Sequence, residues 1–254
     1  MRYRPIDKDP EDPRLGRLIP DDWRHVEQYP LTAPAEEAPT PRPVVIGVNW
    51  YSEFDHPQVT RGGEYFLPGA SSLTTIRGGH CVCLEPAGQP DPDEWWDFYN
   101  QGAEGACVGF GWSRCMSILN KETYAARWLW DRAKESDQWP DTNPGDDNGT
   151  SVHAAGDVLR KAGHVDWKDE YADDDYQERE SYAPAADNGI SRVRWARSVD
   201  DVHKVLGNEA ADAHGAVPIL NSWGRDYPHR VWLPDDALQR LMNEEGEVAV
   251  PTDR

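Results

Sequence analysis

The sequence predicts an α+β protein with two lobes, one helical and one rich in β-strands. Apolar, β-branched segments at 44–50 and 79–84 are typical of buried strands. Apolar side chains then recur at helical spacing between residues 107 and 161. β character returns at 217–220 and 230–233, so strands flank the helices on both sides in sequence. Segregated helices and strands of this kind favour an α+β architecture.

The length and charge of the chain narrow the function classes. Its 254 residues suffice for one large domain or for two small lobes sharing a cleft. With 26 Lys and Arg against 46 Asp and Glu, the formal net charge is −20. Because phosphate binding needs a basic face, we expect no nucleic-acid partner, and no polybasic contact with a membrane. The sequence shows neither a spanning apolar run nor a signal-peptide core, so we expect a cytoplasmic protein without a membrane partner. Four Cys do not make a disulfide framework, which favours a reducing compartment.

The helical elements follow from periodicity and caps. The first is expected at 107–120, with apolar residues on one face, and a second at 124–132. Ser151 can cap a third helix that runs to Lys161 and ends at Gly163. A capping-box pattern at 198–201 opens a short helix to Leu206, and an amphipathic turn at 235–242 follows Pro234.

Three segments are predicted to be surface linkers: 31–43, 85–94 and 207–216. They are rich in Pro, Ala, Gly and acidic residues and lack an apolar period. Residues 166–190 are acidic and irregular, and the span between the first two strands suits a long excursion loop.

Cys107 is the first candidate for chemistry. It falls at the expected first turn of a helix behind Gly105 and Ala106, where the helix dipole and free N–H groups favour a thiolate. Gln101, six residues upstream, could place its side-chain amide at the same oxyanion as the Cys107 backbone N–H. The alternative is that Cys107 is a buried small hydrophobic residue, the usual fate of a free cysteine.

Two further strings add to this candidate. His80 opens an apolar strand behind Gly78 and Gly79, and Asn221 heads the string Asn-Ser-Trp-Gly after the strand at 217–220. Alone, the histidine is more often structural and the second string is a turn with a tryptophan. Together with Cys107 they supply a nucleophile, a base and an orienting amide.

This combination resembles the papain-like cysteine peptidases (family C1), most closely their short bacterial and bacteriophage members. The strings at Gln101 and Gly105 to Cys107, at Gly78 to His80 and at Asn221 to Gly224 match the family's motifs. Gly149 and Thr150 are similar to its substrate-side loop. The resemblance covers residues 15 to 250, apart from the acidic span at 166–190.

The sequence departs from the family pattern in two ways. Glu104 and Val108 stand where the family has a cysteine and an aromatic residue, so one family disulfide is missing. His80 also precedes Cys107, whereas the family order is Cys, His, Asn. A transposition of the segment 43–84 explains this order, with the three linkers as junctions. The expected organisation is a single catalytic domain: an N-terminal segment (1–42), the transposed β segment (43–84), a helical lobe (95–206) and a C-terminal β segment (217–254).

The resemblance implies a two-lobed papain fold, with a β-barrel-like second lobe, and hydrolysis of a peptide bond in a polypeptide substrate. Cys107 would attack, His80 would transfer protons, Asn221 would orient the imidazole, Gln101 would stabilise the oxyanion, and Trp223 would shield the Asn221–His80 pair. No cofactor or metal is implied, and a monomer is the default. A bacterial host cytoplasm or a virion is the expected setting. The alternatives are an inactive papain-like binding module and an amidase or acyltransferase using the same pair.

The sequence gives less support for a metal site than for the cysteine, histidine and asparagine combination. Cys81, Cys83 and Cys115 lack paired zinc-ligand spacing. The run Asp173 to Asp175 lacks the spacing of a calcium loop and favours a solvated acidic loop.

Overall fold

The computed structural model describes residues 40–89, 99–137, 147–166 and 186–252. Within these residues an eight-stranded sheet has the order β2-β3-β7-β6-β4-β1-β8-β5. Its strands are β1 (Val44–Tyr51), β2 (Gln58–Val59), β3 (Tyr65–Phe66), β4 (Ile76–Leu84), β5 (Arg192–Trp195), β6 (Ala216–Leu220), β7 (Arg230–Pro234) and β8 (Glu247–Thr252). The helices are α2 (Cys107–Asn120), α3 (Ala126–Ser136), α4 (Val152–Lys161), α6 (Val199–Leu206), α7 (Glu209–His214) and α8 (Asp235–Asn243). Short 3₁₀ turns occur at η2 (Ser52–Asp55), η3 (Ala70–Ser72), η5 (Ala186–Asn188) and η6 (Gly224–Asp226).

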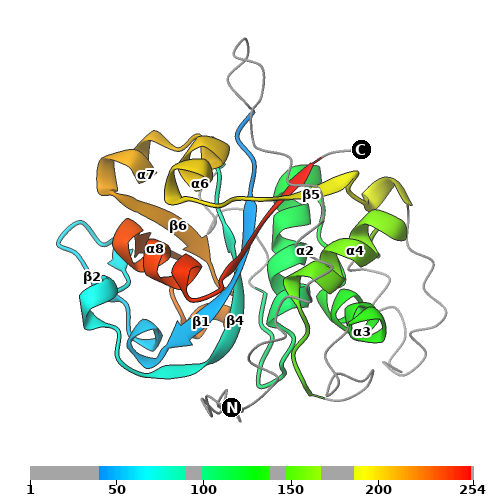
Figure 1. Cartoon of the computed structure of the whole chain (residues 1–254), viewed down its shortest axis with the longest axis horizontal. Helices are drawn as coiled ribbons and strands as arrows, with labels where there is room; N and C mark the ends of the chain where they lie inside the picture. Colours follow the sequence, from blue (N-terminus) through cyan, green and yellow to red (C-terminus); the bar gives the residue numbers. More distant parts are fainter. Residues whose placement is uncertain (1–39, 90–98, 138–146, 167–185, 253–254) are drawn as a thin grey trace.

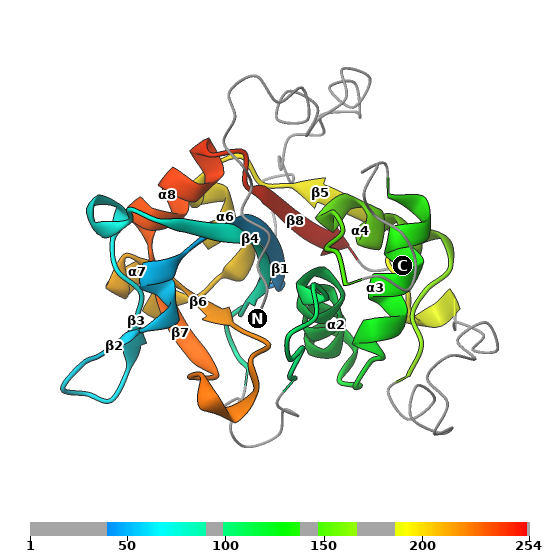
Figure 2. The same cartoon turned by 90° about the horizontal axis from the view of Figure 1, so that it is seen from below.

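Helices cover both faces of the central strands. Figure 1 shows α2, α3 and α4 grouped on one side of β1 and β4, with α6, α7 and α8 on the other. Seen from below, α2 lies beside β1 and nearest to the sheet (Figure 2). The α+β prediction is therefore confirmed at the level of a mixed structure of helices and one sheet.

The two faces of β4 serve different cores because side chains alternate along a strand. Val82 and Leu84 join the cluster that includes α6 and α8. Cys81 and Cys83 point the other way and join the cluster around α2, α3 and α4. Both central strands are thus buried on both faces, which explains their nearly unbroken apolar sequence.

Several expected elements are confirmed at their ends. Helix α2 spans 107–120, and α6 begins after Ser198, whose side chain accepts the Asp201 N–H, and ends at left-handed Gly207. Ser151 caps α4 by accepting the Ala154 N–H. Helix α3 begins two residues later than expected, because Tyr124 pairs as an isolated bridge with Asp166.

The predicted linker at 207–216 is wrong, because it contains helix α7. Asn208 caps this helix by accepting the N–H groups of Ala210 and Ala211, and Gly215 ends it in the left-handed conformation. Ala211 is fully buried against the sheet cluster that includes Trp232. One buried position is too weak a periodic signal to reveal a six-residue helix.

The sequence also left four strands unassigned. β5 and β8 pair with each other, and β8 continues the sheet from β1. β2 and β3 are two residues each and lie in the expected excursion loop. Such short strands form because partners across the sheet offer hydrogen bonds, which no local pattern shows.

Both ends of the segment 43–84 meet the chain at the end of α6. The Arg42 N–H donates to the Val205 carbonyl, and the Ala87 N–H donates to the Leu206 carbonyl, each at 2.9 Å. Beyond β4, the Glu85 N–H donates to the carbonyl of Pro218 in β6 at 3.0 Å. The segment that contains β1 and β4 therefore begins and ends beside the last residues of α6, the helix that precedes α7 and β6 in the chain.

Other sequence predictions lie outside the described residues: the N-terminal segment and its linker up to residue 39, the second half of the linker at 85–94, and the acidic, irregular span from 167 to 185, which includes Asp173 to Asp175. In the part of the chain that the structure describes, no helix has the length and apolar character needed to cross a membrane.

Candidate active site

His80 and Asn221 are joined by a hydrogen bond. β4 carries His80, and Asn221 follows directly after β6, its neighbour in the sheet. The imidazole Nε2 and the Asn221 Oδ1 lie 2.9 Å apart, and both side chains are buried. The Ser222 N–H donates to the same Oδ1 at 2.8 Å, which identifies this atom as the carbonyl oxygen. Nε2 therefore carries a hydrogen, and Nδ1 of the neutral ring is a proton acceptor.

Aromatic rings enclose the imidazole. The Trp223 ring lies 5.0 Å from it, centroid to centroid, with the planes at 33°. Burial lowers the pKa of His80 to about 4, while the Asn221 hydrogen bond opposes this shift and the nearby Arg77 adds to it. His80 is therefore neutral at pH 7 in this state of the protein.

Cys107 is the first residue of α2, and 8 % of its surface is exposed. Ala106 precedes it and offers no side-chain cap, so the N–H groups of the first turn are available. The sulfur faces the backbone N–H of Cys81, the residue that follows His80. A glycine at position 111 permits this contact, since a Cβ there would come within 2.8 Å of the Cys81 sulfur. The helix thus brings the thiol to β4 one residue from His80.

The expected thiolate at Cys107 is not the form that the structure favours. Burial raises the pKa of the thiol to about 11, although the N–H groups of Cys81, Val108 and Cys107 itself lower it. Desolvation of the charged sulfur therefore outweighs the helix terminus. All four cysteines are free and buried, and burial also raises the pKa of Cys81 and of Cys115.

Gln101 lies next to the Asn221 segment. Its backbone N–H donates to the Ser222 carbonyl at 2.9 Å, and its neighbour Asn100 forms an isolated bridge with Trp223. The Gln101 Nε2 donates one hydrogen to the Glu104 carbonyl at 3.0 Å, and its Oε1 is buried without a partner among the described residues. One amide hydrogen remains available for an oxyanion, because a primary amide has two.

The segment 147–151 packs against the approach to α2. A Cβ at Gly105 would come within 2.4 Å of the Asp147 carbonyl and 3.0 Å of the Gly149 nitrogen. The Trp130 indole N–H also donates to the Asn148 carbonyl at 3.0 Å. Gly149 therefore lies beside Gly105, two residues before Cys107.

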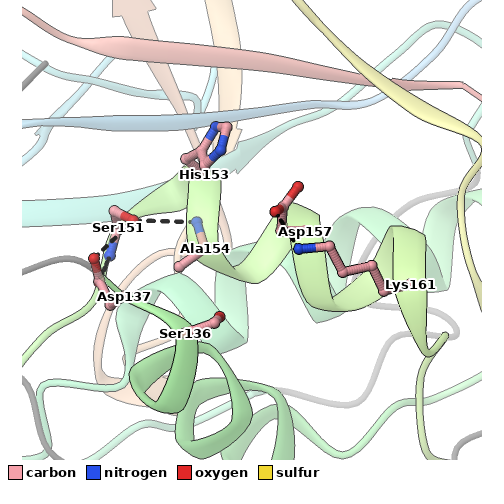
Figure 3. Close-up of a pocket in the computed structure, with 7 residues that line it drawn as sticks. All are labelled: Ser136, Asp137, Ser151, His153, Ala154, Asp157 and Lys161. Carbon is pink, nitrogen blue, oxygen red and sulfur yellow. Dashed lines mark hydrogen bonds and ion pairs between the residues drawn. The ribbon is translucent and has the colours of Figure 1, made fainter. Parts of the chain in front are cut away.

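Asp137 holds the far end of this segment and was missed in the sequence. Its carboxylate accepts the Thr150 hydroxyl at 2.5 Å and the Ser151 N–H at 2.7 Å. Asp137 and Ser151 also line a pocket of about 170 Å³ at the start of α4. Figure 3 shows Asp137 and Ser151 facing each other at one end of it, with Asp157 and Lys161 paired at the other. No local pattern marked Asp137, because its partners lie 13 and 14 residues away.

Glu247 is a second residue that the sequence did not single out. Its Oε2 accepts the N–H of Val152, the first residue of α4, at 3.1 Å. Burial raises the pKa of this carboxyl to about 7. It lies against Gly47 of β1, where a side chain would meet Val152 within 2.6 Å. In the described parts of the chain, no group of three or more His, Cys, Asp or Glu is arranged to hold a metal ion.

Solved structures of cysteine proteases are similar to this chain. Xylellain, a cysteine protease from Xylella fastidiosa, matches with a TM-score of 0.48 and 14% identity over 81% of this chain and 97% of its own. The Carica candamarcensis cysteine protease CMS1MS2, solved in complex with E-64, matches with a TM-score of 0.44 and 11% identity over 61% of this chain and 92% of its own. Digestive procathepsin L 3 of the Tenebrio molitor larval midgut matches with a TM-score of 0.43 and 11% identity over 66% of this chain and 73% of its own. No family model and no curated protein sequence matches the chain.

Proposed function

We propose that this protein is a papain-like cysteine peptidase that hydrolyses peptide bonds in polypeptides through Cys107, His80 and Asn221. The observation that carries the proposal is the buried hydrogen bond of 2.9 Å between His80 Nε2 and Asn221 Oδ1. The next residue of β4, Cys81, offers its backbone N–H to the Cys107 sulfur. The bond between His80 and Asn221 fixes the tautomer that leaves Nδ1 as a base. A thiol at a helix start beside such a base is a nucleophile that can be activated.

The chemistry follows from the protonation states. As the Cys107 sulfur bonds to the carbonyl carbon, its proton passes to His80 Nδ1, and Asn221 Oδ1 holds the resulting imidazolium. Gln101 and the Cys107 N–H donate to the oxyanion. The C–N bond then breaks, and the Nδ1 proton leaves with the amine. Water then gives a proton to Nδ1 and its oxygen to the thioester carbon. The C–S bond breaks, the sulfur takes the Nδ1 proton, and the acid leaves.

The first test is selective modification of Cys107. An epoxysuccinyl peptide should alkylate Cys107 and leave Cys81, Cys83 and Cys115 unmodified, as peptide mapping by mass spectrometry would show. Cleavage of an unfolded protein substrate should be abolished in Cys107→Ala. In His80→Ala it should fall by roughly 10²–10⁴-fold, the usual contribution of a general base. Equal slow labelling of all four thiols, with no cleavage, would instead support an inactive binding module.

An amidase or acyltransferase would use the same pair of residues. Adding amine acceptors to the cleavage assay separates this alternative from hydrolysis, because a transferase would give amide products in place of free acids. We propose hydrolysis because His80 Nδ1 can also act as the general base for a water molecule that attacks the thioester.

We further propose that segment 43–84 is transposed relative to the family order and completes a barrel-like second lobe. The contacts of Arg42 with Val205 and of Ala87 with Leu206 support this, because both ends of the segment lie at the gap that it would have left. All proposed site residues come from a single chain, so we propose an active monomer. Four free thiols suit a reducing cytoplasm.

A further inference from the structure

A β-bulge beside His80 sets a neighbouring aspartate in place. β1 and β4 pair in register as far as Trp50 opposite Gly78, after which Tyr51 lies opposite Ile76. Arg77 is therefore the extra residue of β4. Bulges of this kind redirect a side chain, and Arg77 forms an ion pair with Asp55, the last residue of η2.

Asp55 in turn fixes Trp50. Its Oδ1 accepts the indole N–H of Trp50 at 3.0 Å. Trp50 is 1 % exposed, so the position of its ring is set by this bond and by packing against Phe54 and Trp223 at centroid distances of 5.1 and 5.3 Å. A buried indole whose N–H is bonded to a carboxylate has little freedom to rotate.

Trp50 contacts the imidazole directly. The two ring centroids are 4.7 Å apart and the planes meet at 75°, closer than the contact of His80 with Trp223. The imidazole is thus packed by two indoles and held at Nε2 by Asn221. Removing either indole would open a space into which the ring could turn or water could enter.

We infer that Trp50, fixed by Asp55, is a positioning residue that keeps the His80 imidazole hydrogen-bonded to Asn221 and its Nδ1 directed to Cys107. This inference rests on the proposed function for its catalytic consequence, but the packing itself can be measured without turnover. Asp55 also balances the charge of Arg77, the cation that helps to lower the pKa of His80.

The experiment combines NMR of the ¹⁵N-histidine-labelled full chain with peptide-cleavage kinetics. The His80 Nε2–H resonance is assigned by its loss in His80→Gln. In Trp50→Ala we expect hydrogen exchange at Nε2 to accelerate at least about tenfold, and kcat to fall at least about tenfold while KM stays within about twofold. Trp50→Phe, which keeps a ring, should restore part of both properties.

A matched control is Trp232→Ala in β7. This tryptophan is also buried in the sheet, but it packs on Phe66 and His214 and has no contact with His80. The Trp232→Ala variant should have a lower melting temperature but the same rate of hydrogen exchange at His80 Nε2 as the wild type. If Trp50→Ala does not fold, Asp55→Ala decides, because it removes the acceptor of the indole N–H and leaves the ring in place, and it should change exchange and kcat in the same directions by a smaller factor. Arg77→Ala, which breaks the Asp55–Arg77 ion pair but keeps that acceptor, controls for the loss of the ion pair.

The inference fails if a folded Trp50→Ala, or Asp55→Ala in its place, keeps wild-type exchange and wild-type kcat. The proposed function fails separately: a wild-type protein with a protected Nε2–H that responds to Trp50→Ala, but with no cleavage of any peptide, would contradict the peptidase and leave the positioning role standing.

Discussion

Gly105 lies so close to the Asp147 carbonyl that a Cβ on the glycine would come within 2.4 Å of the oxygen. Because the obstacle is backbone, Gly105→Ala must push the segment 147–149 away from the start of α2. We expect a loss of about 1–3 kcal/mol in unfolding free energy and a higher KM for peptides. Urea unfolding and steady-state kinetics measure the two effects. Gly149→Ala is the stability control, since a Cβ there meets nothing nearer than 3.8 Å; equal stability losses in both variants would contradict this prediction.

Asp137→Ala should loosen the segment 147–151 at the end opposite to Gly105. The carboxylate holds the Thr150 hydroxyl and the Ser151 N–H, and bonds to a charged acceptor contribute about 1.5–3 kcal/mol each at most. We expect KM to rise several-fold with a smaller change in kcat. Ser136→Ala is the matched control, because that hydroxyl lines the same pocket and, within the described residues, bonds only to the Ala133 carbonyl. A wild-type KM in Asp137→Ala would show that the segment does not depend on this carboxylate.

Stability should fall in mild acid. Burial lowers the pKa of His80 to about 4 and that of His164 to about 3, from an ordinary value of 6.5. Between pH 6.5 and 4 the unfolded chain therefore binds a proton on each ring that the folded chain does not, so the unfolding free energy decreases as the pH drops. Burial also lowers the pKa of His153, which adds to this loss. Glu247, with its pKa raised to about 7, and Asp131, whose pKa burial also raises, oppose part of it. Urea titrations at pH 7 and pH 5 test this, and equal or greater stability at pH 5 would refute it.

The reactivity of Cys107 should rise steeply with pH. With a pKa of about 11, the thiolate fraction increases nearly tenfold for each pH unit between 6 and 10. Iodoacetamide labelling of Cys107, followed by mass spectrometry, should show this slope without a plateau at neutral pH. A plateau from pH 5 upward would show instead that Cys107 and His80 exist as an ion pair before substrate binds.

A reordered chain should fold. Joining 88–206, 41–87 and 208–254 through short Gly-Ser linkers restores the family order and needs little added length, because Arg42 bonds to Val205 and Ala87 to Leu206. The control is residues 41–254 in the natural order. We expect both proteins to give the same circular dichroism spectrum and the same selective alkylation of Cys107. A reordered chain that stays unfolded while its control folds would contradict the transposition.

Local sequence determined the elements that carry the site. The helical period from Cys107 to Leu119 and the caps at Ser151 and Ser198 predicted three helices, because caps and amphipathic periods are satisfied within a few residues. The motif strings likewise singled out His80, Cys107 and Asn221. Helix α7 and the two-residue strands β2 and β3 were not predicted because they are too short to show a period, and β5 and β8 were not predicted because they pair with each other from distant parts of the sequence.

The tertiary structure alone decided how these residues behave. A helix start by itself predicts an acidic thiol, but the packing of α2 on β4 removes water from Cys107 and raises its pKa instead. The contacts of Trp50 with His80 and of Asp137 with Thr150 join residues 30 and 13 positions apart. Desolvation and side-chain packing depend on what surrounds a group in three dimensions, and the order of residues along the chain does not contain that information until the chain has folded.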